Sequence, residues 1–264
     1  MLLLLALTAC TDPDDTGTID TAPSFSEGPF CDPREQVGSV EITRYGTAGG
    51  LSVSARIWDK PDPWLGPPTA STEACGFFEY ANCGSCDSGL VCHYDGTCVE
   101  PRRARTDVSL ETSVGDYVPD ETGLMWGDAA VLESYSFRLQ QPEGDVVVDS
   151  LALQDGLVAA VSSAGDYDVP GALSVSWTGS DQGHVRTVIP INHHAGAPTF
   201  TSCRAEASAG GFEVPADMVN PLSVATGLEF QGVHHGDFAA METDAGCIQF
   251  GVWTQHQSDV QFSR

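Results

Sequence analysis

The sequence predicts an all-β protein: an Ig-like β-sandwich that carries an inserted small disulfide-rich module and follows a disordered N-terminal tether. Apolar and polar residues alternate with a period of two along most of the chain, which is typical of strands with one buried face. The 28 glycines and 16 prolines fall largely between these alternating runs, where turns are needed. No long run of apolar residues has the i, i+3, i+4 spacing of an amphipathic helix, so we expect sheets to supply the core.

The first predicted element is a β-hairpin. Val40 and Ile42 alternate with polar neighbours, and residues 51–57 repeat the pattern as LSVSARI. The glycine-rich residues 45–50 supply the turn between the two runs. We therefore expect two antiparallel strands that bury one face.

Further strands are predicted downstream, with one short helical turn among them. Residues 146–153 and 157–161 are interpreted as partners in a second hairpin. Residues 215–221 begin and end with proline, which permits one helical turn at most. The other predicted strands contain these alternating residues: Val108, Leu110, Thr112 and Val114; Tyr135, Phe137 and Leu139; Leu173, Val175 and Trp177; Val185, Thr187 and Ile189; Leu228 and Phe230; Ile248, Phe250 and Val252.

The chain begins with an apolar leader that ends in a cysteine. Residues 7–10 read Leu-Thr-Ala-Cys, the form of a bacterial lipobox, in which the cysteine is lipidated and becomes the new N-terminus. No Lys or Arg precedes Cys10, although a secretory signal normally has a basic n-region. We therefore expect residues 1–9 to be a truncated lipoprotein signal peptide whose natural start lies upstream. Residues 10–30 are then the lipidated cysteine and an acidic tether too poor in apolar residues to fold.

The other eight cysteines are an even number, which suits four disulfides in an oxidising compartment. We divide the rest of the chain into an N-terminal hairpin region at 31–74, a cysteine-rich module at 75–105 and a β-sandwich domain at 106–264. Residues 83–86 form a CxxC, but no second CxxC follows, so a disulfide framework is favoured over a zinc or redox site. We expect Cys203 and Cys247 to bridge to each other. The pairing of the remaining six stays open: Cys31, Cys75, Cys83, Cys86, Cys92 and Cys98.

The chain is strongly acidic. Eleven Lys and Arg oppose 37 Asp and Glu, which gives a net charge of −26. Such a chain repels nucleic acid and anionic headgroups, so we expect no nucleic-acid partner and membrane contact only through the lipid on Cys10. The one basic cluster, residues 102–105, is interpreted as neutralising nearby carboxylates, with a partner or processing site as the alternative.

Paired histidines are the candidate metal ligands. His193 and His194 form one pair, and His234 and His235 form another, each beside a loop-forming residue. Imidazole binds Zn, Cu or Ni, but neighbouring residues of a strand face opposite ways. Each pair therefore suits a divalent metal only if it lies in a loop or at a strand end, which is where we place both. Exposed loop histidines are the alternative interpretation.

Three tryptophans are candidate sugar-stacking residues. Trp58, Trp64 and Trp126 lie near prolines or glycines, in segments interpreted as loops. The flat face of an indole matches the C–H face of a pyranose. The alternative is that these rings cover the edge of the core.

Several segments carry a resemblance to a known group of proteins. They are VSARIWDKPDP, the module ending CGSCDSGLVCHYDGTCV, and the pair LSVSWTGSD and FTSCRAEASAGGFEVPADMV. With the lipobox, they resemble the predicted lipoproteins of myxobacteria and their relatives, most of which have no assigned function. The module alone resembles the cysteine-rich repeats called Dickkopf N-terminal-like, which implies disulfides and not signalling. The resemblance implies an outer-membrane lipoprotein, on the periplasmic or surface face, and Thr11 after Cys10 agrees with sorting to that membrane.

The sequence contains neither Gly-x-Ser-x-Gly nor His-Glu-x-x-His, and no glycine-rich phosphate loop precedes a helix. We therefore predict a non-enzymatic lipoprotein of the bacterial cell envelope, with a binding or structural role, no cofactor, and a protein or glycan ligand. The first alternative is a carbohydrate-binding or adhesion module that uses the tryptophans. The second is a metal-binding protein or metal-dependent enzyme that uses the paired histidines.

Overall fold

The computed structural model describes residues 30–46, 49–80, 83–191, 199–223, 227–256 and 259–263. Cys10, the leader, all but the last residue of the tether, and the pair His193 and His194 lie outside these ranges. No helix among the described residues has the length and apolar character needed to cross a bilayer.

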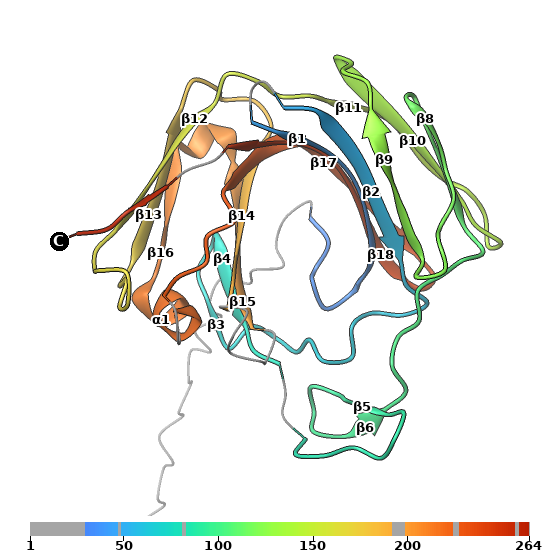
Figure 1. Ribbon diagram of the computed structural model, residues 1–264, viewed down its shortest axis with the longest axis horizontal. Helices are drawn as coiled ribbons and strands as arrows, with labels where there is room; N and C mark the ends of the chain where they lie inside the picture. The colour runs from blue at the N-terminus through green and yellow to red at the C-terminus, as the bar shows by residue number, and fades with distance from the viewer. Residues whose placement is uncertain are drawn as a thin grey trace, which may run out of the picture.

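A curved nine-stranded sheet forms the body of the protein (Figure 1). All neighbouring strands in it are antiparallel except β1 and β18, which are parallel. The sheet draws on both ends of the chain, because the hairpin β1–β2 lies between β18 and β9. In spatial order the strands are β3 (Ala70–Ser71), β4 (Cys75–Phe78), β15 (Phe200–Glu206), β14 (His184–Pro190), β17 (Val233–Thr243), β18 (Gly246–His256), β1 (Gln36–Tyr45), β2 (Leu51–Ile57) and β9 (Leu124–Ala129).

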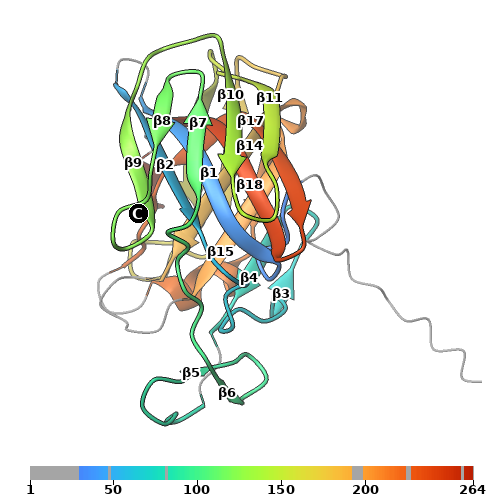
Figure 2. The ribbon, with the colours of Figure 1, turned by 90° about the vertical axis from the view of Figure 1, so that its right-hand side faces the viewer.

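Two four-stranded sheets cover the convex side of this arch, one on each limb (Figures 1 and 2). The first contains β11 (Val146–Ala152), β10 (Ser134–Gln140), β7 (Ser109–Thr112) and β8 (Gly115–Tyr117). The second contains β16 (Gly211–Val214), β13 (Leu173–Thr178), β12 (Val158–Ser163) and β19 (Val260–Gln261). A short helical segment lies beside the second sheet, namely η1 (Ala207–Ala209), α1 (Ala216–Val219) and η2 (Asn220–Leu222).

The hydrophobic core lies between the arch and these outer sheets. Val40 and Ile42 of β1 are fully buried against the first outer sheet, where the rings of Phe137 and Phe250 lie 5.7 Å apart. Under the second sheet the buried residues include Trp177, whose indole N–H donates to the Ala207 carbonyl at 2.6 Å. Because successive residues of a strand point to opposite faces, the polar partners of these core residues face the concave side of the arch.

The all-β prediction is confirmed, as is sheet-on-sheet packing, which here occurs twice. The hairpin is also confirmed, with β2 on residues 51–57, and the helical turn forms at Ala216–Val219. The second predicted hairpin is wrong: β11 pairs with β10 and β12 pairs with β13, in different outer sheets. The chain crosses between them because Leu153 packs on one core and Leu157 on the other. Residues 228–230 are not a strand, although Leu228 is buried.

The boundaries drawn at residues 74 and 106 do not separate units of the sheet. The region 31–74 supplies β1 to β3, and the region 106–264 supplies β9, β14, β15, β17 and β18 of the same sheet. Cys75 begins strand β4 of that sheet, so the small module is confined to the segment around β5 (Val91–Cys92) and β6 (Cys98–Val99). This module lies apart from the arch (Figure 2).

Eight cysteines form four disulfides: Cys31–Cys247, Cys75–Cys203, Cys83–Cys92 and Cys86–Cys98. The expected Cys203–Cys247 bridge is wrong. Cys203 lies on β15 and Cys247 on β18, with β14 and β17 between them. Three steps of about 4.8 Å each place their backbones about 14 Å apart, whereas a disulfide needs Cα atoms within about 7 Å.

Candidate functional site

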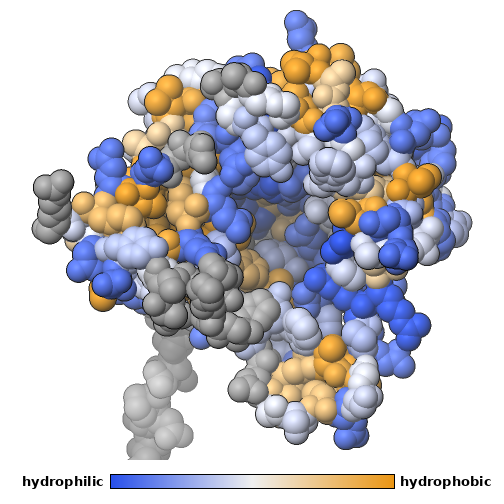
Figure 3. All heavy atoms as spheres, viewed as in Figure 1, coloured by the Kyte–Doolittle hydropathy of each residue, from blue (hydrophilic) through white to orange (hydrophobic). Residues whose placement is uncertain are grey.

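A cavity of about 450 Å³ opens on the concave side of the arch. Figure 3 shows the molecule hollowed at its centre, with hydrophilic side chains in the recess. Strands β1, β2, β14, β15 and β18 supply the floor, and the walls come from residues before β1 and after β2. Hydroxyl and amide groups in the lining belong to Gln36, Ser39, Ser202 and Gln249, and the aromatic rings belong to Phe30, Trp58, Tyr80 and Phe200.

Four of the ten arginines of the chain line this cavity. Arg56 comes from β2, Arg186 from β14 and Arg204 from β15, while Arg102 follows the cysteine module. They converge because each of the three strand residues occupies a concave-facing position, opposite in the alternation to core residues such as Val185. The recess therefore gathers four guanidinium groups within a chain whose net charge is −26.

Arg186 forms a two-pronged ion pair with Glu41 of β1. Its Nη1 and Nη2 atoms donate to Oε1 and Oε2 of Glu41 at 2.6 and 2.8 Å. Both side chains are about a fifth exposed. Burial alone would raise the pKa of Glu41, but the charge and hydrogen bonds of Arg186 outweigh it and hold that pKa below its ordinary value. Arg186 also lies over the ring of Trp253, 4.1 Å from its centroid.

Arg102 is held by a carboxylate and an aromatic ring. Its Nη2 lies 2.8 Å from Oδ2 of Asp62, which also accepts a hydrogen bond from the Tyr80 hydroxyl at 3.4 Å. Burial, and then the Asp62 charge, raise the pKa of Tyr80 to about 12. The Arg102 guanidinium carbon is 4.2 Å from the centroid of Trp58. This cation–π contact engages Trp58, so its ring positions an arginine.

Arg56 forms no ion pair with a carboxylate among the described residues, although its charge helps to lower the pKa of Asp120, after the hydrogen bonds from Thr122 and Leu124. Its guanidinium carbon is 5.5 Å from the centroid of Trp58, and its Nη2 lies 3.5 Å from the hydroxyl of Thr122. Its Nε is buried without a hydrogen-bond partner. The Arg56 guanidinium therefore has N–H groups that donate no hydrogen bond among the described residues.

Arg204 is the most enclosed cation of the cavity. Its Nη1 donates to the carbonyl of Cys31 at 3.2 Å, and its guanidinium carbon lies 4.7 Å from the centroid of Phe30. Burial lowers the pKa of Arg204 to about 10, against the opposing effect of Asp32. The side chain is still charged at neutral pH, because this pKa remains well above 7.

The three predicted tryptophans do not form one platform. Trp58 lines the cavity, whereas Trp64 is half-buried with its ring 5.7 Å from that of Tyr80. Trp126 is 64% exposed on the edge strand β9, directly opposite Ser54 and on the same sheet face as Glu41. Trp126 alone of the three is fully available for stacking.

The described histidine pair lies at the start of a strand and within its ladder, not in a loop. His234 and His235 are the second and third residues of β17 and therefore face opposite sides of the sheet. His235 is fully buried with Nε2 2.8 Å from the Gln182 carbonyl oxygen, while His234 faces the concave side. Burial first, and then the charge of Arg186, lower the pKa of His234 to about 4. The two rings cannot bind one metal ion together.

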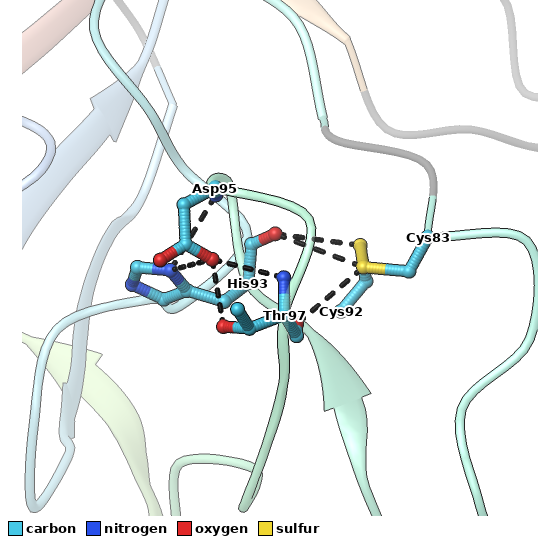
Figure 4. Close-up of polar contacts among 5 residues, drawn as sticks. All are labelled: Cys83, Cys92, His93, Asp95 and Thr97. Carbon is cyan, nitrogen blue, oxygen red and sulfur yellow. Dashed lines mark hydrogen bonds and ion pairs between the residues drawn. A yellow bond between two sulfur atoms is a disulfide. The ribbon is translucent and has the colours of Figure 1, made fainter.

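The cysteine module is closed by disulfides and a tight turn (Figure 4). Oδ1 of Asp95 accepts hydrogen bonds from the Thr97 amide and hydroxyl at 2.9 and 2.7 Å, and lies 2.8 Å from Nδ1 of His93. The Thr97 bonds, followed by His93, lower the pKa of Asp95 to about 2. The sulfurs of Cys83, Cys86 and Cys98 lie within 4.8 Å of one another, the sole such grouping of metal-ligand types in the described ranges. All three belong to disulfides and lack the thiolate that a metal requires.

The basic cluster at 102–105 neutralises carboxylates, as interpreted from the sequence. Arg103 lies 3.9 Å from Glu100, and Arg105 lies 2.9 Å from Asp107 and 3.0 Å from Glu143. Sequence reasoning missed the gathering of arginines. A signal was present in β2, where Arg56 occupies the polar side of an alternation otherwise filled by serines.

Neither a scan against protein-family models nor a search of curated proteins found a match to this chain.

Proposed function

We propose that the protein is a lipid-anchored binding protein of the bacterial cell envelope and that the concave cavity is its glycan-binding site. The observation that carries this proposal is the difference between the two faces of the large sheet. The convex face is buried against the outer sheets, whereas the concave face lines a cavity of about 450 Å³. That volume lies in the range of about 300–1,000 Å³ typical of ligand sites.

The lining suits a hydroxyl-rich ligand. Ser39 and Ser202 offer hydroxyls, and Gln36 and Gln249 offer amides, so each can both donate and accept hydrogen bonds. The exposed ring of Trp126 extends the same sheet face beyond the cavity and supplies an apolar surface of the kind that sugar rings stack on. This proposal combines the predicted binding role with its carbohydrate alternative.

Binding is favoured over catalysis by the ionisable groups of the cavity. Arginine keeps its charge at neutral pH and does not serve as a general acid or base. Asp62 in the lining and Glu41 beside it are held in ion pairs with Arg102 and Arg186. The cavity thus holds fixed charges that orient a ligand.

A filled-cavity variant tests this proposal. Ser39 lies on the cavity floor between Arg56 and Gln249, so Ser39→Trp should obstruct it, whereas Val158→Trp places the same bulk on an exposed site of an outer sheet. The full chain with Cys10→Ser is screened on a glycan array, and hits are measured by titration calorimetry. We expect at least tenfold weaker binding for Ser39→Trp only, with circular dichroism unchanged. Failure of every glycan to bind, or equal binding by both variants, would overturn the proposal.

The anchor is tested separately on the natural protein. We propose that Cys10 becomes the lipidated N-terminus, and this is checked by mass spectrometry of the protein extracted from outer-membrane fractions. A diacylglycerol-modified Cys10 is expected. A chain that retains an unmodified Met1 would remove the lipid anchor from the proposal.

A further inference from the structure

A second cavity, of about 510 Å³, opens on the concave face of the large sheet. Strands β1, β2, β17 and β18 contribute to its lining. On the basis of the proposed glycan-binding role, we infer that the two cavities form one groove and that its ligand is a linear, uncharged oligosaccharide of at least four sugar units.

The two cavities meet at one ion pair. Arg186 lines the first cavity and Glu41 lines the second, and the Arg186 Nη atoms donate to the Glu41 carboxylate at 2.6 and 2.8 Å. His234, also in the second lining, lies directly opposite Arg186 on the neighbouring strand. Both side chains of the ion pair are about a fifth exposed. A ligand that extends from one cavity into the other therefore passes over this pair.

Strand β1 runs through both cavities and gives the groove its length. Its concave-facing residues are Ser39 in the first lining and Glu41, Thr43 and Tyr45 in the second. The six residue steps from Ser39 to Tyr45 cover about 20 Å, at about 3.3 Å per step. A disaccharide spans only part of that length, whereas a linear tetrasaccharide spans it.

Exposed aromatic rings flank the second cavity. Tyr45, in its lining, is 57% exposed, and Trp126, at 64% exposure, lies directly opposite Ser54, which is also in the lining. Among the described residues, Tyr45 and Trp126 are the only exposed large hydrophobic side chains of the nine-stranded sheet. In the first cavity, by contrast, the guanidinium of Arg102 lies over the ring of Trp58. Sugar rings stack on exposed aromatic faces, so the second cavity adds stacking surface to the polar lining of the first.

The second lining also offers hydrogen-bond partners for sugar hydroxyls. Thr43 and Ser54 supply hydroxyls. The amide of Gln255 donates to the Gln231 carbonyl at 2.6 Å, which orients its own carbonyl oxygen as an acceptor. The pKa of His234 is about 4, so its ring is neutral at pH 7 and can both donate and accept. These groups suit the hydroxyls of further sugar units.

The charges along the groove disfavour a charged sugar. Glu41 pairs with Arg186, and Asp62 pairs with Arg102. The second lining contains no Lys or Arg, so a sugar carboxylate there would meet only Asp259 and the already paired Glu41. An amino sugar would meet four guanidinium groups in the first cavity. Like charges brought together are costly, so a ligand that fills both cavities is uncharged.

The test compares short with long oligosaccharides. The full chain with Cys10→Ser is titrated with the disaccharides and hexasaccharides of β-1,4-glucose, β-1,4-N-acetylglucosamine and α-1,4-glucose, and with hexagalacturonate as the charged comparison. Ser54→Trp obstructs the second cavity, and Tyr45→Ala removes a stacking ring from it. Tyr167→Ala is the matched control, because this ring is 50% exposed in the loop between β12 and β13. Circular dichroism and urea midpoints confirm that each variant is folded.

We expect at least one neutral hexasaccharide to bind at least tenfold more tightly than its disaccharide, in the protein and in Tyr167→Ala. That ratio should fall below about threefold in Ser54→Trp and be intermediate in Tyr45→Ala. Three results would overturn this inference and leave the glycan proposal standing: equal binding of short and long sugars, an undiminished ratio in either groove variant, or hexagalacturonate binding as tightly as the best neutral hexasaccharide. The same holds if none of the three neutral series binds while other glycans on the array do. Failure of every glycan to bind would remove both.

Discussion

Removing the disulfide between Cys31 and Cys247 should cost the protein about 4.6 kcal/mol of stability. The two residues are 216 positions apart, but the Cys75–Cys203 bridge, with its separation of 128, lies inside this loop. The shortest covalent path closed by Cys31–Cys247 is therefore the difference, 88 residues. The chain-entropy relation gives about 4.6 kcal/mol at 25 °C for a loop of that length.

The assay is urea unfolding of the double variant Cys31→Ala/Cys247→Ala in a chain that also carries Cys10→Ser, which leaves no free thiol. Its control is Cys83→Ala/Cys92→Ala, which opens a separation of only 9 residues in the module outside the arch. We expect a loss of about 4–5 kcal/mol for the first variant and less than about 1 kcal/mol in the main transition for the second. A loss below about 2 kcal/mol for the first variant would refute the loop-closure reasoning. Equal losses in the two variants would do the same.

Three further predictions concern side chains of the arch. Arg186→Met leaves the Glu41 carboxylate unpaired and should cost about 2–4 kcal/mol in urea unfolding at pH 7, part of which Glu41→Gln restores; no restoration would contradict the pairing. The folded pKa of Glu41 lies below its ordinary 4.5, so the stabilisation from the Glu41–Arg186 ion pair is complete above pH 4.5. It is lost as the pH falls from 4.5 through the folded pKa, and Arg186→Met should not show this loss. His234 has a folded pKa of about 4 against an ordinary 6.5, so the unfolded chain binds more protons between these values. Stability should therefore fall from pH 6.5 to 4, and less steeply in His234→Gln; parallel pH profiles would count against this. Phe250→Ala opens the fully buried core and should cost about 3–5 kcal/mol, whereas Trp126→Ala, at 64% exposure, should change stability by less than about 0.5 kcal/mol; similar melting shifts would contradict the burial pattern.

Alternation predicted many of the strands and the face that each buries, but it missed β9 and β17 and wrongly placed a strand at residues 228–230. Val40 and Ile42 enter the core and Ser39 does not, because strand geometry sends neighbours to opposite faces. The pattern does not say which strands pair. Residues 146–153 and 157–161 are close in sequence and both alternate, yet Leu153 and Leu157 pack on different cores.

The disulfides and the cavity depend on the order of strands, which has no local signal. Cys203 pairs with Cys75 because β15 and β4 are neighbours, although 128 positions separate the two residues. Arg56, Arg186 and Arg204 likewise come together through strand order and the curvature of the sheet. The sequence showed which residues lie on the polar face of each strand. It did not show that these polar faces line one concave surface.

The bridge from Cys31 to β18 also determines how the protein responds to mechanical load. A pull on the chain before Phe30 passes through the disulfide to Cys247, the second residue of β18, as well as along the backbone into β1. Because β1 and β18 are parallel, both are drawn in the same direction from their N-terminal ends. They move as one unit against the antiparallel β2 and β17, so the ladder hydrogen bonds on both sides are loaded in shear. Such a ladder bears load along its whole length at once, so a pull from this end meets the hydrogen bonds of both strand pairs together.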